Sequence, residues 1–282
     1  PALGPISLPY GAGSRLLDRF IQSRSTRDRL ARPFAKDLEA LTAEQEIEEA
    51  ERVRREVTRA FAWTGWRETQ LSDPATFEEF VTTRGLDHIT HARAAGHGVI
   101  LALVTTRLKG RYKYIPALTE KPFGTIANLA PDRIEFYGLG PLARRTGGKV
   151  SETVQSARVA QIHNAHKVLR KGGTVGVFMD AFDGTGGMAV PMLGRKRPIR
   201  PGIAELALDS NCVIIPVEQW LHKDGRITFD FKPALVAEGE SRDERLLSQM
   251  VQQAGALEEM WRTNPGHMNE EAIRRQLRLP KA

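Results

Sequence analysis

Residues 168–180 read VLRKGGTVGVFMD, a helical ending followed at once by a short apolar run. The pair Gly172-Gly173 is typical of the end of a helix. The apolar run, residues 174–179, is too short for a helix of its own but has the length of a buried strand, and it ends on the acidic residue Asp180. The stretch therefore predicts a helix, over residues 151–170, that leads into a strand of a parallel sheet.

Two further units repeat this pattern. Residues 86–95 are helical in pattern and residues 98–104 are an apolar strand, and the same order returns in residues 202–209 and 213–217, with Ser210-Asn211 where the helix should end. Repeated alternation of helix and strand predicts an α/β fold with a layered, mostly parallel central sheet flanked by helices.

The two flanking regions read as helical. Residues 14–84 are rich in Ala, Glu, Arg and Leu with apolar side chains at helical spacing, and residues 242–262 and 269–278 predict two helices separated by Pro265-Gly266. We predict a single domain over residues 1–282: a helical N-terminal layer (1–84), a sheet core that carries the site (85–240) and C-terminal helices (241–282).

Cysteine content and hydropathy exclude several classes of protein. The 282 residues include one cysteine, Cys212, which argues against a disulfide framework or a cysteine-rich zinc site and favours a packing role for its thiol; we expect no metal. No apolar run approaches the roughly 20 residues of a membrane helix, and the first residues do not read as a signal peptide. We expect a cytoplasmic protein, with peripheral contact at the inner membrane face as a further option.

The net charge of +7 favours an anionic partner. Such a partner is a phospholipid surface, a phosphorylated cofactor or an acidic carrier protein. Nucleic acid fits worst, because no recognition helix, RNP motif or zinc-finger spacing is present and few aromatic residues are interleaved with the basic ones.

Two groups of motifs resemble the bacterial lipid A acyltransferases and their phosphatidylinositol mannoside relatives. Residues 85–89 (GLDHI) and 94–101 (AAGHGVIL) resemble the opening of the catalytic half of that family. A stronger match covers residues 168–173, 179–180, 190–195, 202–207 and 214–217, and the pieces in order span roughly residues 33–217. The resemblance implies an acyltransferase-like fold and the transfer of a fatty acyl group from a thioester donor.

The family's catalytic pair is altered in this chain. In the family, a histidine just past the first strand and an acidic residue five positions later activate the acceptor hydroxyl. Alignment of the strand at residues 98–104 places Thr105 and Gly110 at these two positions. Neither side chain is a base near neutral pH, and general-base assistance is typically worth about 10²–10⁴-fold. The resemblance therefore implies a divergent member with altered catalytic residues.

Substitutes for the missing base should lie where parallel strands end, because sites of α/β proteins form at that edge. Asp180 and Glu218 each end a predicted strand and Asp183 follows shortly after, so these three carboxylates are the predicted catalytic residues. Two converging acids can raise the pKa of one towards that of a useful base. The alternative for Asp180 is structural, to cap a turn or hold the loop at residues 184–187.

The histidines are poorly placed for this role. Of the seven, only His222 follows a predicted strand, and His267 lies in a region that the pattern does not place. The others precede the first strand or sit late in the helix before the second: His88, His91, His97, His163 and His166.

Basic residues predict anion binding. Residues 194–200 (GRKRPIR) lead into the helix that starts near Gly202, and a basic cluster at a helix N-terminus suits a phosphate of lipid, coenzyme A or phosphopantetheine. The alternative is a solvated basic loop. By resemblance, Arg195 matches a family position, and Arg144 and Arg145 occupy the place of a cleft arginine. The predicted substrate-binding residues are Thr105, Thr106, Arg107, Arg144, Arg145, Arg195 and Lys196.

Three functions follow from these features. The first is an acyltransferase with altered catalytic residues that uses acyl-CoA or an acyl carrier protein as co-substrate, holds no permanent cofactor and transfers to an amine or hydroxyl acceptor. The second is an inactive homologue that binds lipid or an acyl-carrier ligand as a partner subunit. The third keeps the fold but acts on carrier-bound small acids. The retained Asp180 and Gly194-Arg195 favour an enzyme.

Overall fold

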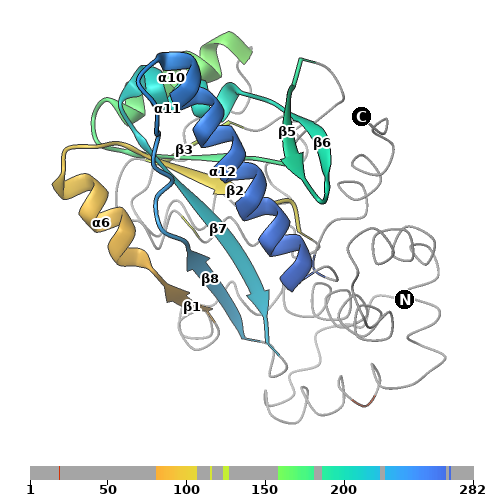
Figure 1. Cartoon of the computed structure of the whole chain (residues 1–282). Coiled ribbons are helices and arrows are strands. Elements are labelled where there is room, and N and C mark those ends of the chain that lie inside the picture. The colour runs from red at the N-terminus through yellow and green to blue at the C-terminus, as the bar shows by residue number, and fades with distance from the viewer. Residues whose placement is uncertain are drawn as a thin grey trace.

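The computed structural model of the chain describes residues 19, 81–106, 115, 123–126, 158–180, 186–222, 226–264 and 267. In these ranges four longer helices, α6 (Leu86–Ala94), α10 (Arg158–Leu169), α11 (Gly202–Ser210) and α12 (Arg242–Thr263), accompany eight strands (Figure 1). The strands are β1 (Val81–Arg84), β2 (Val99–Leu103), β3 (Phe123–Ile126), β4 (Thr174–Phe178), β5 (Met188–Met192), β6 (Arg195–Ile199), β7 (Val213–Leu221) and β8 (Ile227–Phe231).

Six of these strands form one sheet in the order β1-β8-β7-β2-β4-β3. Neighbouring strands run parallel except β7 and β8, which are antiparallel. The predicted α/β fold with a mostly parallel sheet flanked by helices is therefore confirmed. None of the helices within the described ranges combines the length and the apolar character needed to cross a bilayer.

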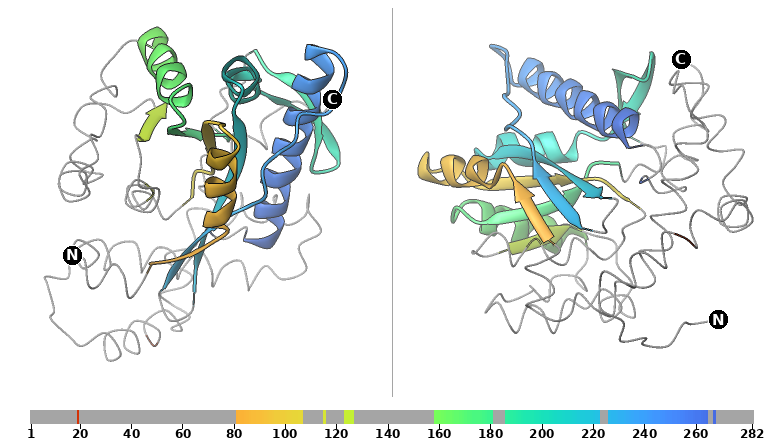
Figure 2. Two further views of the ribbon diagram at one scale, coloured as in Figure 1. Left: turned by 90° about the vertical axis from the view of Figure 1, so that its left-hand side faces the viewer. Right: turned by 90° about the horizontal axis from the view of Figure 1, so that it is seen from below.

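Both faces of the sheet are covered, which explains why its central strands are mostly apolar. On β2, Ile100 and Ala102 belong to a core cluster shared with α10, α11 and α12. The alternate residues Val99, Leu101 and Leu103 belong to a second cluster that includes side chains of α6. The left view of Figure 2 shows β7 and β8 between α6 and α12.

Tight helix ends set the start of each central strand. After α10 the chain turns through Gly172, whose φ is +71°, and Asn211 ends α11 in the left-handed region with φ 52°. Both ends lie where the sequence predicts them. Gly98 enters β2 between these ends, and a Cβ at this position would lie 2.4 Å from the carbonyl oxygen of Leu169.

Two predictions about elements are wrong. Residues 81–84 were expected to close the helical N-terminal layer, but their β-branched sequence Val-Thr-Thr forms β1, which pairs in parallel with β8. The strand predicted at residues 213–217 continues to Leu221, so Glu218 lies inside it. Residues 194–200, for which a solvated loop was the alternative to an anion-binding cluster, supply β6 and one of the two turn residues of the hairpin β5–β6. Its turn residues, Leu193 and Gly194, have φ of 54° and 68°, the two positive values that a tight hairpin turn requires.

One of the predicted flanking helices is described by the structure, and the others lie mostly or wholly outside the described residues. α12 confirms the helix predicted at residues 242–262. Nearly all of the predicted helical layer at residues 14–84, and the helix predicted at residues 269–278, lie outside the described residues.

Candidate functional site

The strands β2 and β4 end side by side, and the parallel pairing of β2 with β7 stops at the same level, although β7 itself continues to Leu221 beside β8. Leu103 is in register with Phe178 on one side and with Val217 on the other. Thr105 and Asp180 follow the ends of β2 and β4, and Glu218 is the first residue of β7 beyond its pairing with β2, so the structure brings these three predicted site residues to one edge of the parallel part of the sheet. Glu218 was predicted to end its strand, but it lies inside β7, because that strand continues beside β8. This edge, made by the ends of β2 and β4 and the adjoining part of β7, is called the strand-end edge below.

Thr105 and Asp180 bind each other through two hydrogen bonds. The backbone N–H of Thr105 donates to Oδ2 of Asp180 at 2.8 Å, and its Oγ1 donates to Oδ1 at 2.8 Å. Asp180 is only 4% exposed. Thr105 therefore ties the end of β2 to the end of β4. These two bonds are consistent with the structural alternative for Asp180, and residues 181–185, which include part of the loop considered for it, lie outside the described residues.

Thr106 makes the corresponding contact on the other side of β2. Its Oγ1 donates to Oε1 of Gln219 on β7 at 3.2 Å, and both residues are buried. Two successive threonines thus link β2 to both neighbouring strands. Each hydroxyl uses its proton inside the protein and keeps a lone pair that can accept a further hydrogen bond.

Glu218 lies at the centre of a buried polar group. Its Oε2 is 3.1 Å from Nζ of Lys232, which is also 2.9 Å from Oδ2 of Asp230. Asn264, which ends α12, donates from Nδ2 to Oε1 of Glu218 at 3.0 Å. The group therefore joins β7, the end of β8 and the end of α12.

Burial and the contacts within this group shift the pKa values of Glu218 and Lys232. Burial raises the pKa of Glu218 more than the hydrogen bonds from Lys232 and Asn264 lower it. Burial alone would lower the pKa of Lys232, but its hydrogen bonds to Asp230 and Glu218 outweigh this effect and leave that pKa raised. Lys232 is therefore a cation at neutral pH.

All seven histidines fall within the described ranges, and five of them lie away from the strand-end edge, on α6, on α10 or just before β2. His97 contacts the carbonyl of Asn211, and His166 contacts the Ser210 hydroxyl at 2.7 Å, both where the central strands begin. His222, just after β7, contacts the Thr228 hydroxyl at 2.7 Å.

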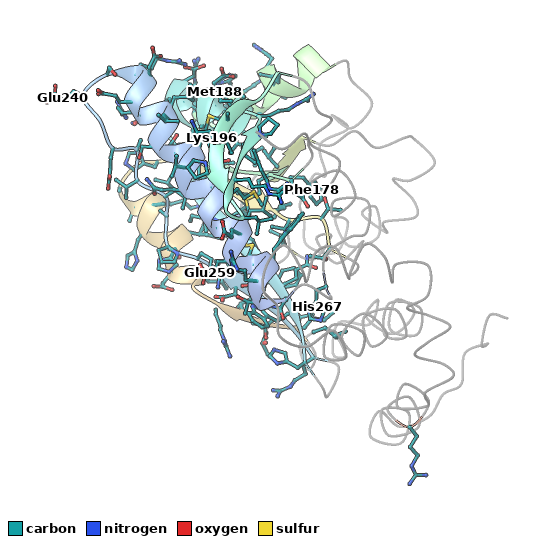
Figure 3. The ribbon with its side chains drawn as sticks, turned by 45° about the vertical axis from the view of Figure 1, so that its right-hand side comes forward. Phe178, Met188, Lys196, Glu240, Glu259 and His267 are labelled. Atoms are coloured by element: carbon teal, nitrogen blue, oxygen red, sulfur yellow. The ribbon has the colours of Figure 1, made fainter. Side chains whose placement is uncertain are left out.

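His267 is the histidine that comes nearest to the Glu218 group through the chain. Its N–H donates to the carbonyl of Asn264 at 3.0 Å, its side chain is buried, and Figure 3 shows it beyond the end of α12. Sequence reasoning did not find Lys232, Asn264 or His267 as members of the site region. The only signal was the polar residue that ends the long helix at Asn264.

The basic run is held as a hairpin against α12. Arg197 is only 3% exposed and donates from Nε to the carbonyl of Met192 at 3.3 Å, so it supports the hairpin and is not available to a ligand. The Leu193 N–H donates to Oε2 of Glu258 on α12 at 2.7 Å. Lys196 faces solvent, as Figure 3 shows, and Arg195 is half-buried. α11 begins at Gly202, as predicted.

Other predicted site residues lie outside the described ranges: Arg107, Gly110, Arg144, Arg145 and Asp183. Within those ranges, no group of three or more His, Cys, Asp and Glu side chains could hold a metal ion.

A parallel sheet with threonine, carboxylate and amide side chains gathered at its strand-end edge, and a basic hairpin before the next helix, defines an α/β protein with a strand-end site. The bacterial lipid A biosynthesis acyltransferase family matches residues 8–266, so the chain belongs to that family. The resemblance found in the sequence is thereby confirmed. No curated protein sequence matches the chain.

Proposed function

We propose that this protein transfers an acyl group from acyl-CoA or an acyl carrier thioester to an amine or hydroxyl acceptor at the strand-end edge. The family match across residues 8–266 carries the proposal, because it includes every strand that forms this edge. In such a transfer the acceptor attacks the thioester carbonyl carbon, the C–S bond breaks, and the thiol leaves with the proton that the acceptor loses.

The basic residues supply the donor's binding site in this proposal. Arg195 and Lys196 on β6 would bind a phosphate of coenzyme A or phosphopantetheine, together with Arg144 and Arg145. The exposure of Lys196 and the start of α11 three residues after β6 support this role. The net charge of +7 supports an acidic carrier protein as partner, or peripheral contact with an anionic membrane surface.

Thioester turnover tests the proposal. Purified protein is incubated with labelled acyl-CoA and acyl-carrier thioesters, and thioester loss and ligand retention are followed with amine, alcohol and water as acceptors. We expect the rate of turnover to fall at least about tenfold in Arg195→Ala, because this substitution removes roughly one charge-assisted hydrogen bond to the donor. Lys171→Ala, an exposed cation just before β4 at the opposite edge of the sheet, is the matched control and should not change the rate.

A second candidate function is binding without turnover. The pair Thr105–Asp180 favours it, because a residue that replaces the family's histidine is bound to a neighbouring carboxylate. Saturable retention of the thioester without turnover would identify an inactive homologue that acts as a partner subunit.

A further inference from the structure

The contacts of the carboxylates at the strand-end edge limit which acceptors the site can use. An alcohol must lose its proton as it attacks a carbonyl, so its transfer depends on a base that can reach the hydroxyl. An uncharged amine attacks with its lone pair and loses a proton afterwards. The two acceptor classes therefore make different demands on Asp180 and Glu218.

Asp180 is already engaged on both oxygens. Oδ1 and Oδ2 each accept a hydrogen bond of 2.8 Å from Thr105, and one of the two donors is a backbone N–H. Each oxygen has a second lone pair, but the side chain is almost fully buried, so an acceptor alcohol has little access to it.

Glu218 is engaged in the same way. Oε1 accepts from Asn264 at 3.0 Å, and Oε2 lies 3.1 Å from the ammonium of Lys232. Both partners hold Glu218 from the ends of α12 and β8, and the side chain is only 3% exposed. These contacts suit a residue that secures α12 on the sheet, and the burial of the carboxylate leaves an acceptor little access to it.

We infer that the acceptor of this site is a weakly basic amine, one that is uncharged near neutral pH, such as a hydroxylamine, a hydrazine or an α-amino compound. The inference rests on the proposed function and narrows its acceptor class. An α-amino group has a pKa of about 7.7–8.0, so a useful fraction is uncharged near neutral pH, whereas an alkylamine like that of lysine, at about 10.4, is almost wholly protonated.

The reaction then balances without a base from the protein. The amine nitrogen forms a bond to the thioester carbonyl carbon, the C–S bond breaks, and the thiolate takes up the proton that the nitrogen releases, directly or through water. Positioning of the two reactants by the site supplies the rate enhancement.

The first test uses the unmodified protein with decanoyl-CoA as donor. Glycinamide, n-butylamine and glycerol are compared as acceptors at pH 7.5, with the rate in the absence of protein subtracted. We expect protein-dependent transfer to glycinamide to exceed transfer to glycerol by about 10²-fold or more, the usual value of general-base assistance, which the buried Asp180 and Glu218 would not give to the alcohol. We also expect n-butylamine to be slow at this pH because so little of it is uncharged.

The dependence of the transfer rate on pH tests whether the titrating group is the acceptor amine. The rate should rise with pH and level off above the pKa of the amine, so its midpoint should move when glycinamide is replaced by a less basic amine such as hydroxylamine. A midpoint that stays fixed for every amine would report a titrating group of the protein and would overturn the inference.

A gain-of-function variant gives a second test. Thr105→His with Gly110→Glu restores the residue types of the family's pair, and the backbone N–H of residue 105 can still donate to Asp180. We expect glycerol transfer to rise by about 10²-fold. Thr105→Ser with Gly110→Glu is the matched control, because serine keeps the hydroxyl donor and adds no base, and it should show no such gain.

The outcomes distinguish a failure of the inferred acceptor class from a failure of the proposed acyl transfer. Transfer to glycerol that equals or exceeds transfer to glycinamide in the unmodified protein overturns the acceptor class and leaves acyl transfer standing. Thioester that is never lost with any acceptor overturns the proposed function, and the inference with it.

Discussion

At position 105 a single side chain changes what the site can do. A histidine there would accept a proton, whereas the threonine hydroxyl donates one hydrogen bond to Asp180 while the backbone N–H donates another. The next residue, Thr106, donates in the same way to Gln219. Thr105 therefore makes a structural contact through its side chain as well as through its backbone.

Thr105→Val should destabilise the fold, because it removes the donor to Oδ1 of a buried carboxylate and leaves only the backbone bond. We expect the free energy of unfolding to fall by about 1–3 kcal/mol, the usual range for a buried group that loses its partner. Urea denaturation followed by circular dichroism measures this. Thr105→Ser keeps the hydroxyl and should cost clearly less; equal losses in the two variants would contradict the role of the hydroxyl.

Gly98→Ala should also destabilise, for a steric reason. The new Cβ would lie 2.4 Å from the carbonyl oxygen of Leu169 and 2.9 Å from Sγ of Cys212, and the first of these atoms is backbone. We expect a loss of about 1–3 kcal/mol in thermal or urea unfolding. Gly255→Ala on the exposed side of α12 meets no atom within 4 Å and should instead stabilise by about 0.5–1 kcal/mol. Similar effects of the two substitutions would contradict the close packing at Gly98.

Among the elements, the hairpin β5–β6 and helix α12 depend on each other through one carboxylate. Glu258 accepts from the Leu193 N–H in the hairpin turn and pairs with Arg262 one helical turn further along α12 at 2.8 Å. Burial by itself raises the pKa of Glu258, but these two contacts and the charge of Arg197 outweigh burial and lower it.

A lowered pKa in the folded state gives a stabilisation that is present above the unfolded-state pKa of about 4.3 and is lost as the pH falls through the folded-state pKa. We therefore expect the unmodified protein to exceed Glu258→Gln in free energy of unfolding at pH 6, by up to about 1.5–3 kcal/mol, with a smaller difference at pH 3. Urea unfolding at both pH values measures this. The exposed neighbour in Glu259→Gln is the control, and an unchanged difference at the two pH values would contradict the assignment.

The elements also differ in how well the sequence predicts them. β2, β4 and the parallel part of β7 are buried on both faces, so each is a mostly apolar run, which marks the ends of β2 and β4 and the point where β7 leaves β2, although β7 itself continues to Leu221. Hence Thr105, Asp180 and Glu218 could be placed at one edge in advance. β6 could not be recognised, because RKRPI buries only Arg197 and Ile199 and its remaining charges resemble a loop.

The rest of the site region depends on long-range packing that local pattern does not encode. Lys232 reaches Glu218 only because β8 returns antiparallel beside β7, and that strand was not predicted. Asn264 reaches the same carboxylate only because α12 crosses the sheet and ends beside it (Figure 1). No periodicity in residues 226–267 indicates either approach.

For the molecule as a whole, the reactivity of the single cysteine measures whether the core unfolds cooperatively. Cys212 lies in the core cluster beneath α10, α11 and α12, and its Sγ donates to the carbonyl of Ser210 at 3.2 Å. Burial raises the pKa of this thiol to about 11. Its predicted packing role agrees with this position.

We expect Cys212 to react with a thiol reagent such as Ellman's reagent only when the core opens. At pH 8 about one thiol in 10³ would be ionised at that pKa, and the thiolate is the reactive form. One equivalent should label rapidly in concentrated urea and slowly without it, and the labelling should follow the unfolding curve. Rapid labelling of the native protein would show that this part of the core opens locally.

The pairing of β1 with β8 also determines when the sheet can be completed during translation. Val81 takes Ile227 as its partner, so on a ribosome the strand that emerges first among the six must remain without its neighbour while some 146 further residues are added (227 − 81). At about 5–20 residues per second this wait is on the order of ten seconds. The nascent chain therefore carries an unpaired β1 throughout this interval, and the last described strand of the sheet, not the first, completes it.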